Sequence, residues 1–256
     1  MIITAVAVGT RGDVNPLAEL GEEMIRRGHE FRILTSEAFR SLIENKGVTF
    51  IKLDTEADHV MKYLVTDYKT SLDFAKGMFR LKKENPEYMA QTLNAINGSD
   101  LVMYGTCAAF ARHAAEFLKI PCARLFYSPM DPTRQYSLYC DEYDSDKVLK
   151  SYDGLPQGMN FMTMIAVNGW RRSVGLPRWR LNSSYTDRIR CGPKPLYIRK
   201  RLCSIDEIVD ALNDLVSGKY DVKAHEISQE IKKENGIISA ADAIEDYLEE
   251  RKHYPV

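Results

Sequence analysis

The chain has 256 residues, 45% of them hydrophobic, and its 35 basic and 36 acidic residues leave a net charge of −1. This size and composition predict a globular protein with a buried core, and the balanced charge argues against binding to DNA or RNA. No apolar run is long enough to span a membrane, so at most peripheral membrane contact is expected. The five cysteines lack metal-ligand spacing, which favours reduced thiols, a cytoplasmic location and no metal site.

The amino terminus combines a strand, a loop and the start of a helix. The apolar run Ile2–Val8 predicts the first strand, and Asn15 and Pro16 are typical of an N-cap and a first helical residue. Apolar residues then recur at helical spacing until Gly28, where the helix is expected to end. Because a helix start presents N–H groups and the positive end of its dipole, this junction suits an anion or a reacting group. Asp13 lies in its middle.

The chain then alternates strands with helices. Strands are expected at 31–35, 48–53, 100–104 and 122–126, and helices at 36–47, 72–83, 86–96 and 106–118. This order predicts an α/β protein with a single Rossmann-like parallel sheet, because parallel neighbours need crossover connections of this length. The polar stretch 54–98, which includes two of these helices, is interpreted as an insertion over one face of the sheet.

The middle of the chain contains a long polar loop and a methionine-rich helix. Residues 127–154 are interpreted as a loop, and loops of that length usually have a function or are mobile. Residues 157–174 predict one amphipathic helix, whose methionine-rich stripe suits either core packing or an adaptable apolar pocket. A basic patch, interpreted as a solvated face or as a phosphate contact, follows at Arg171, Arg172, Arg178 and Arg180.

The carboxy-terminal part is expected to be helical. Residues 183–203 show no convincing element and are interpreted as a linker. Helices are expected at 204–216, 221–236 and 239–248. Helices without strands cannot build a second sheet domain, so this tail, residues 204–256, must pack on the first domain or on another chain.

Several ordered landmarks resemble a known family. They are Gly9-Thr10-Arg11-Gly12-Asp13-Val14-Asn15-Pro16, Arg27-Gly28-His29, Ile120-Pro121, Asn168-Gly169-Trp170-Arg171-Arg172 and Gly175-Leu176-Pro177. Together they resemble family 1 GT-B glycosyltransferases, in the branch that glucosylates sterols, lipids and polyketide or glycopeptide antibiotics. The similarity covers residues 1–182, which the resemblance identifies as a Rossmann-like acceptor-binding domain and the amino-terminal half of a GT-B fold.

The resemblance implies a reaction and a role for the opening loop. Asp13 matches the general base that removes the proton of the acceptor hydroxyl, in an inverting displacement without a metal ion. Thr10, Arg11 and Gly12 would face the diphosphate of a nucleotide sugar, a UDP- or dTDP-sugar, which is a co-substrate and the only cofactor-like molecule expected. The alternative is that Asp13 merely caps the helix that starts beside it.

The same resemblance places a lipophilic acceptor, a sterol, lipid or polyketide, among aromatic and methionine side chains. The acceptor-binding residues that it implies are Phe79, Phe126, Tyr127, Pro129 and Met162. Such residues suit an apolar body with one hydroxyl end, and they suit a protein core equally well.

The chain departs from the family in its second half. The glycine-rich donor motif with its histidine has no counterpart, and residues 183–203 resemble the segment that follows that motif. Residues 204–256 resemble the family's final helices, the last of which would pack back on the first domain. This predicts a glycosyltransferase that is encoded in shortened form or completed by a separate donor-binding subunit, and the uncovered apolar stripes of the tail helices predict a homodimer or a partner subunit. The alternatives are a catalytically incomplete acceptor-binding module and an unrelated nucleotide-binding reductase, and the missing Gly-x-Gly-x-x-Gly fingerprint argues against the reductase.

Overall fold

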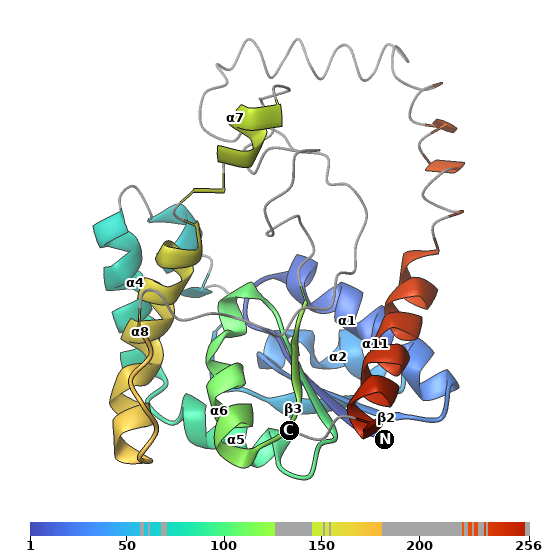
Figure 1. Cartoon of the computed structure of the whole chain (residues 1–256), viewed down its shortest axis with the longest axis horizontal. Helices are drawn as coiled ribbons and strands as arrows, with labels where there is room; N and C mark the ends of the chain where they lie inside the picture. The colour runs from blue at the N-terminus through green and yellow to red at the C-terminus, as the bar shows by residue number, and fades with distance from the viewer. Residues whose placement is uncertain are drawn as a thin grey trace.

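One parallel sheet organises the protein, as the computed structural model shows in Figure 1. The structure describes residues 1–56, 59–60, 62–67, 71–125, 145–150, 152–153, 155–180 and 235–253, together with positions 222, 225, 226, 228, 229 and 233. The strands are β1 (Ile2–Val6), β2 (Glu30–Thr35), β3 (Thr49–Lys52), β4 (Leu101–Tyr104) and β5 (Cys122–Arg124). Their spatial order is β3-β2-β1-β4-β5, which confirms the predicted α/β fold with a Rossmann-like sheet.

The strand order decides where a site can form. The chain runs outward from β1 through β2 to β3 and then crosses back to β4 on the other side of β1. All four described pairings are parallel, and Val6 at the end of β1 aligns with Leu34 on one side and Tyr104 on the other. The carboxyl ends of the strands therefore meet at one edge. In open α/β sheets, ligands bind at this edge, in the crevice where the strand order reverses, which here lies between β1 and β4.

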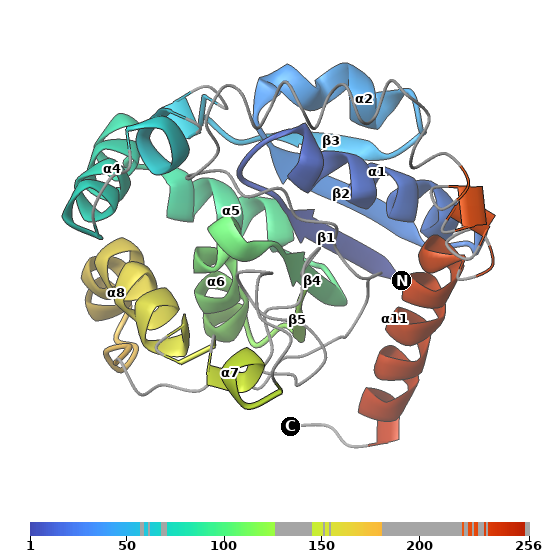
Figure 2. The ribbon, with the colours of Figure 1, turned by 90° about the horizontal axis from the view of Figure 1, so that it is seen from above.

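Helices cover both faces of the sheet, as the view from above shows (Figure 2). The first face carries α1 (Arg11–Arg26), α2 (Arg40–Glu44) and α11 (Gly236–His253), and the second carries α5 (Tyr88–Ile96) and α6 (Phe110–Leu118). Beyond the second face, α4 (Ser71–Glu84) packs against α8 (Leu155–Ser173). The shorter elements are η1 (Glu37–Phe39), η2 (Lys62–Thr66), η3 (Thr106–Ala108) and α7 (Ser145–Lys150). In the part of the chain that is described, every helix is too short or too polar to cross a membrane.

Strand β4 is apolar along its whole length because both of its faces are covered. In β4, Leu101 and Met103 pack into the core beneath α1, whereas Val102 and Tyr104 pack into the core beneath α5 and α6. Successive side chains of a strand point to opposite faces, so a strand between two helical layers needs apolar residues at every position. This explains why the expected strands could be placed to within a few residues.

The first helix begins earlier than expected. The structure starts α1 at Arg11 and places Pro16 inside it, so the predicted start at Asn15 and Pro16 is wrong. The physical reason is a capping box, in which the Thr10 hydroxyl accepts the Gly12 N–H at 3.1 Å and the Asp13 carboxylate accepts the Thr10 N–H at 2.7 Å. This box satisfies donors of the first turn and so outweighs the hydrogen bond that Pro16 cannot make.

The predicted loop at 127–154 contains a helix that the sequence reading missed. Residues 145–150 form α7, whereas residues 126–144 lie outside the described part of the chain. Val148 within α7 and Tyr152 just after it are only 1% and 2% exposed. Burial of these side chains stabilises a helix that is too short to show a recognisable apolar period.

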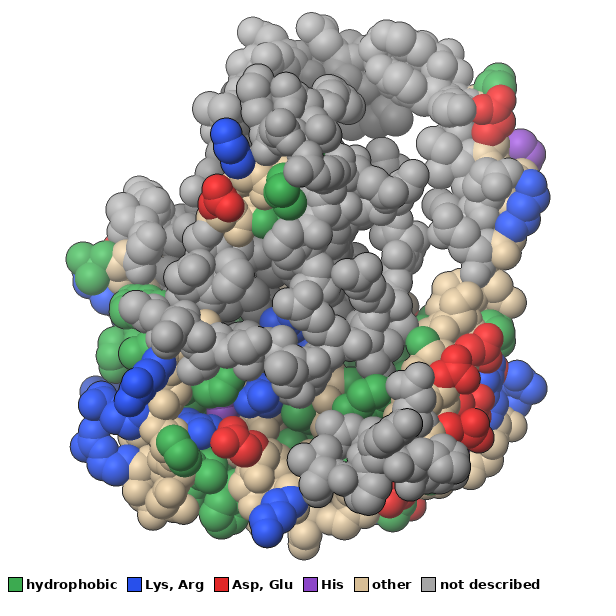
Figure 3. Space-filling model, viewed as in Figure 1, with side chains coloured by type: hydrophobic (Ala, Val, Ile, Leu, Met, Phe, Trp, Pro, Cys, Tyr) green, Lys and Arg blue, Asp and Glu red, His purple; other side chains and the backbone are tan. Residues whose placement is uncertain are grey.

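The last helix packs on the first face, as expected for the end of the tail. In α11, Ala240, Ala241, Ile244 and Leu248 are buried in the same core as α1, and Ala243 and Tyr247 pack against it. Arg27 joins the two helices through ion pairs to Asp242 at 2.7 Å and Glu245 at 2.6 Å, and His29 also contacts Glu245. Acidic side chains gather over α11 beside basic ones in the space-filling view (Figure 3). The helix expected at 204–216, and most of the one at 221–236, lie outside the described residues.

Candidate functional site

The loop after β1 holds Asp13 at the reversal of strand order. Gly9 has a φ of +149°, a conformation that L side chains rarely adopt, and a Cβ there would lie 2.2 Å from Oδ2 of Asp13. The Asp13 carboxylate therefore rests directly on the backbone of Gly9. Only glycine allows this close approach, so the loop is built around the position of that carboxylate.

The hydrogen bonds of Asp13 make it part of the helix cap. Its Oδ2 atom accepts the Thr10 N–H at 2.7 Å and lies 3.2 Å from the Thr10 hydroxyl, which donates to it. The capping role, one of the two interpretations of this residue, is thus observed. It does not conflict with the other, because an ionised carboxylate has room for about four hydrogen bonds.

The three neighbours expected to face a diphosphate lie at the same helix start. Thr10 is the N-cap, and Arg11 and Gly12 are exposed residues of the first turn of α1. The Gly12 N–H already donates to the Thr10 hydroxyl. What this corner offers an anion is therefore the positive end of the helix dipole, with the Arg11 side chain on its surface.

Cys107 is a neighbour of Asp13 that the sequence reading missed. It follows β4, the strand beside β1, and it is exposed on the surface. Desolvation of the sulfur by neighbouring protein atoms and, to a lesser degree, the negative charge of Asp13 raise the pKa of the Cys107 thiol to about 11. The thiol is therefore neutral at physiological pH and is a poor nucleophile there. Its position just after an expected strand is the signal that could have placed it at this edge.

A small apolar cavity of about 60 Å³ opens beside this corner. Its lining comes from the opening loop, α4, α5, α6 and α8, in the residues Val8, Thr55, Met78, Leu81, Lys82, Asn85, Tyr88, Cys107, Phe110 and Ala166. The Tyr88 ring packs edge-on against Phe110 with ring centroids 5.0 Å apart, and the Tyr88 hydroxyl donates to the Ala166 carbonyl at 2.6 Å. The cavity therefore has rigid aromatic walls.

The structure places only some of the expected acceptor residues. Phe79 is 57% exposed on the outer side of α4, whereas Met78, Leu81 and Lys82 form the stripe of that helix that lines the cavity, together with Asn85 just after it. Met162 belongs to α8, but its side chain is outside the described part, as are the three other acceptor candidates, Phe126, Tyr127 and Pro129. The phenylalanine lies one position from the lining stripe, about 100° around the helix, so it points elsewhere.

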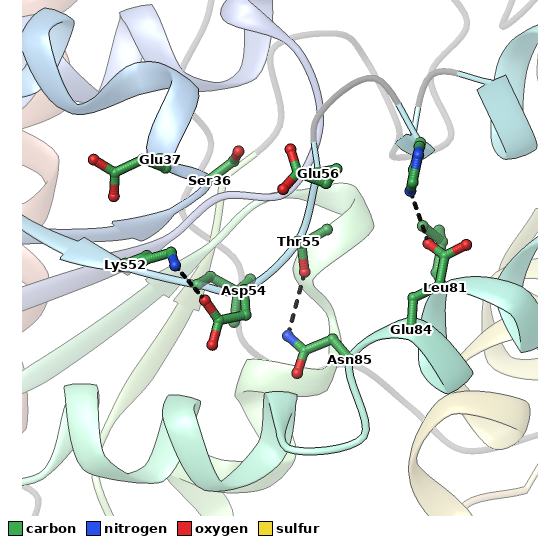
Figure 4. A pocket seen from close by; sticks show the side chains of 11 residues that line it. Ser36, Glu37, Lys52, Asp54, Thr55, Glu56, Leu81, Glu84 and Asn85 are labelled. Carbon is green, nitrogen blue, oxygen red and sulfur yellow. Dashed lines mark hydrogen bonds and ion pairs between the residues drawn. The ribbon is translucent and has the colours of Figure 1, made fainter.

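A larger, polar cavity of about 300 Å³ adjoins the first (Figure 4). It lies where β2 and β3 end and where α4 ends, and it is lined by Ser36, Glu37, Lys52, Leu53, Asp54, Thr55, Glu56, His59, Leu81, Glu84 and Asn85. Thr55, Leu81 and Asn85 line both cavities. The sequence reading did not single out these polar residues, although several of them directly follow expected strands.

The basic patch at the end of α8 is only partly solvated. Arg171 is 3% exposed and binds Glu116 through two hydrogen bonds of 2.6 and 3.0 Å, and it donates to the Pro177 carbonyl and to Nδ1 of His113. It therefore fixes the segment after α8 onto α6 and cannot reach a phosphate, so both interpretations of Arg171 are wrong. The other members of the patch, Arg172, Arg178 and Arg180, are exposed.

The buried His113 should make stability depend on pH. Burial first, and then the charges of Arg171 and Arg112, lower the pKa of His113, while Glu116 opposes them. The unfolded chain therefore binds more protons, so we expect stability to be complete above about pH 6.5 and to fall below it. Unfolding free energies between pH 7.5 and 5.5 should show a smaller slope in His113→Gln. The exposed His225→Gln is the control, and equal slopes in both variants would contradict this role.

Gly9→Ala should displace the Asp13 carboxylate. The added methyl group would overlap Oδ2, and the backbone angle is strained for alanine. We expect a loss of about 1–3 kcal/mol in unfolding free energy, measured by urea denaturation. Gly105→Ala is the matched control, since Gly105 also follows a strand, has a φ of −83° and has open space where a Cβ would lie. Equal stability of the two variants would mean that the carboxylate does not rest on Gly9.

Comparison with known proteins places this architecture in context. The family model described as Glycosyltransferase family 28 N-terminal domain matches residues 3–137. The sterol 3-beta-glucosyltransferases of Yarrowia lipolytica and Debaryomyces hansenii are each 32% identical to the chain, over 189 and 186 residues. These alignments cover 71% and 70% of the chain but only 13% and 12% of the two relatives, so the chain spans about an eighth of their length.

Two solved structures of glycosyltransferases are also similar. SsfS6 of Streptomyces sp. SF2575 aligns with a TM-score of 0.49 and 16% identity, over 70% of this chain and 48% of SsfS6. The calicheamicin glycosyltransferase CalG4 aligns with a TM-score of 0.47 and 22% identity, over 68% of this chain and 43% of CalG4.

Proposed function

Because this chain belongs to the family of the glycosyltransferase family 28 N-terminal domain, we propose that it forms the acceptor-binding half of a glycosyltransferase. The reaction would move a sugar from a nucleotide sugar, a UDP- or dTDP-sugar, to a hydroxyl group of a lipophilic acceptor. The observation that carries this proposal is the Asp13 carboxylate, held on Gly9 at the reversal of strand order and near Cys107, which lines an apolar cavity. A carboxylate base and an apolar cavity at the same edge of the sheet suit a hydrophobic acceptor that carries a hydroxyl group.

In the proposed reaction, Asp13 acts as the general base. Its carboxylate takes the proton of the acceptor hydroxyl while the hydroxyl oxygen bonds to the anomeric carbon, and the bond from that carbon to the diphosphate breaks. This single displacement inverts the anomeric configuration. The amino-terminal end of α1, with Thr10, Arg11 and Gly12, would stabilise the negative charge on the departing diphosphate.

The cavity and the relatives support a lipophilic acceptor. The relatives' name, sterol 3-beta-glucosyltransferase, suggests an apolar ring system with one hydroxyl group. The cavity of about 60 Å³ has room for only about two water molecules, so it would hold the edge of such a body rather than all of it. Phe126, Tyr127, Pro129 and Met162 would complete the binding surface.

The donor side requires a further contribution. No stretch of this sequence resembles the family's donor motif, so in the proposed reaction the nucleotide contacts would come from a separate donor-binding part. The second candidate function is an acceptor-binding module without turnover of its own. The capping bonds of Asp13 favour it, because they give that residue a structural role that needs no chemistry.

Thermal unfolding with ligands tests the proposal. Ligands that bind only the folded chain raise its melting temperature, by an amount that corresponds to about 2.7 kcal/mol at 100 times the dissociation constant. We expect cholesterol or ergosterol in mixed micelles to raise it, and UDP or UDP-glucose alone to have a smaller effect. A shift with UDP-glucose and none with any sterol or polyketide would contradict an acceptor-binding half. Transfer of labelled glucose in the presence of a donor-binding chain would then distinguish the enzyme from the binding module.

A further inference from the structure

We infer that the larger cavity binds a hydroxyl-rich group of the same acceptor, so that the preferred acceptor carries a sugar or polyol beside its apolar body. This inference rests on the proposed function, because it assigns a second part of the acceptor to the same binding edge. The inference narrows the acceptor to an amphipathic alcohol. The apolar cavity alone would fit any apolar alcohol.

The two cavities are neighbours. Thr55, Leu81 and Asn85 belong to both linings, so a ligand with one part in each cavity would lie across these three residues. The polar cavity, at about 300 Å³, reaches the lower end of the range of about 300–1,000 Å³ for small-molecule sites. It is therefore large enough for a compact polar group.

Most carboxylates of this cavity are already engaged by neighbouring side chains. Three of its four carboxylates already have charged or hydroxyl partners. Asp54 contacts Lys52 at 2.7 Å, as Figure 4 shows, and Glu37 contacts Arg40 outside the lining at 2.6 Å. Glu84 contacts His59 at 3.0 Å and accepts the Tyr63 hydroxyl at 2.8 Å. Paired carboxylates attract an added cation weakly but still accept hydrogen bonds from hydroxyl groups.

Two buried polar side chains in the lining have unused or weak hydrogen bonds. Ser36 is 7% exposed, forms no cap bond to η1, and has no side-chain partner among the described residues. Asn85 is 5% exposed, and its amide donates to Thr55 and Gln91 over 3.5 and 3.3 Å, at or beyond the long end of usual bonds. Both side chains line the cavity with hydrogen-bonding capacity to spare, so they suit a ligand that donates and accepts hydrogen bonds.

Hydroxyl groups meet this requirement better than an ammonium group does. The carboxylates only accept, whereas the serine hydroxyl and the amide can both donate and accept. A sugar or polyol offers both functions at each hydroxyl, but an ammonium group can only donate. The inferred group is therefore a neutral polyhydroxyl unit attached to the apolar acceptor.

Matched amphiphiles test this inference by isothermal titration calorimetry of the full chain. The probes are n-octyl β-D-glucoside below its micelle concentration, 1-octanol and n-octylamine, which share one apolar tail. We expect the glucoside to bind about tenfold more tightly than octanol. Ser36→Ala removes the unpartnered hydroxyl without breaking a cap bond, and it should weaken glucoside binding about three- to tenfold while leaving octanol binding unchanged. Ser41→Ala, an exposed position on α2, is the control.

Each outcome separates the two proposals. Equal binding of glucoside and octanol, or an unaltered glucoside affinity in Ser36→Ala, would overturn the polyol subsite and leave the apolar acceptor site standing. Tighter binding of octylamine than of glucoside would overturn it in favour of a cation site. Glucoside binding that depends on Ser36 would support the subsite even if no glucosyl transfer were found, and in that case only the proposed function would fail.

Discussion

Asp13→Asn is expected to lower the rate of sugar transfer by about 10²–10⁴-fold, the usual contribution of a general base. Asparagine has nearly the same size as aspartate and fits above Gly9, but its amide cannot take the proton of the acceptor hydroxyl. The affinity for the acceptor should stay within a few-fold of the original, because the apolar lining is unchanged. Initial rates with a nucleotide sugar and a donor-binding chain, together with acceptor titrations, provide the measurement.

A second substitution separates catalysis from capping. Thr10→Ala removes one partner of the capping box and leaves the Asp13 carboxylate in place, so it should cost about 1 kcal/mol of stability with a much smaller loss of rate. The exposed Asp153→Asn is the control for loss of charge alone. If Asp13→Asn transferred sugar as fast as the unaltered protein, Asp13 would be only a helix cap.

Ile244→Ala should destabilise the docking of the last helix by about 2–5 kcal/mol, since this side chain is fully buried between α11 and the core beneath α1. The loss removes contacts between segments more than two hundred positions apart, so α11 should open before the sheet does. Hydrogen exchange of residues 237–250 and urea unfolding together would show whether the opening is local.

The exposed Val222→Ala is the control for this variant, because Val222 is 75% exposed and its truncation should change the unfolding free energy by less than about 0.5 kcal/mol. Ion pairs from Arg27 to Asp242 and Glu245 are partly exposed and contribute less than the apolar contacts. If Ile244→Ala had no larger effect than the control, the packing of α11 on α1 would not hold in solution.

Local patterns were enough to predict the fold class and the family. The short, mostly apolar runs at 31–35 and 100–104 predicted strands, and both are observed as β2 and β4. The opening landmarks resemble GT-B glycosyltransferases, and the match to the glycosyltransferase family 28 amino-terminal domain confirms that resemblance. The landmarks pointed to family 1 of these enzymes, whereas the matching domain is that of family 28. Such patterns can be recognised in a sequence because buried apolar residues recur with the period of the helix or strand that contains them.

What the sequence by itself determined is therefore the order of the elements, the parallel sheet and the place of Asp13 in the loop after the first strand. Only the tertiary structure decided that Asp13 is a cap resting on Gly9, that Arg171 is buried against Glu116, and that Asn85 lines two cavities. The reason is distance along the chain. Periodicity reports whether a residue is buried, but ion pairs and cavities depend on which remote residues meet, and that is settled only when the helices pack on the sheet.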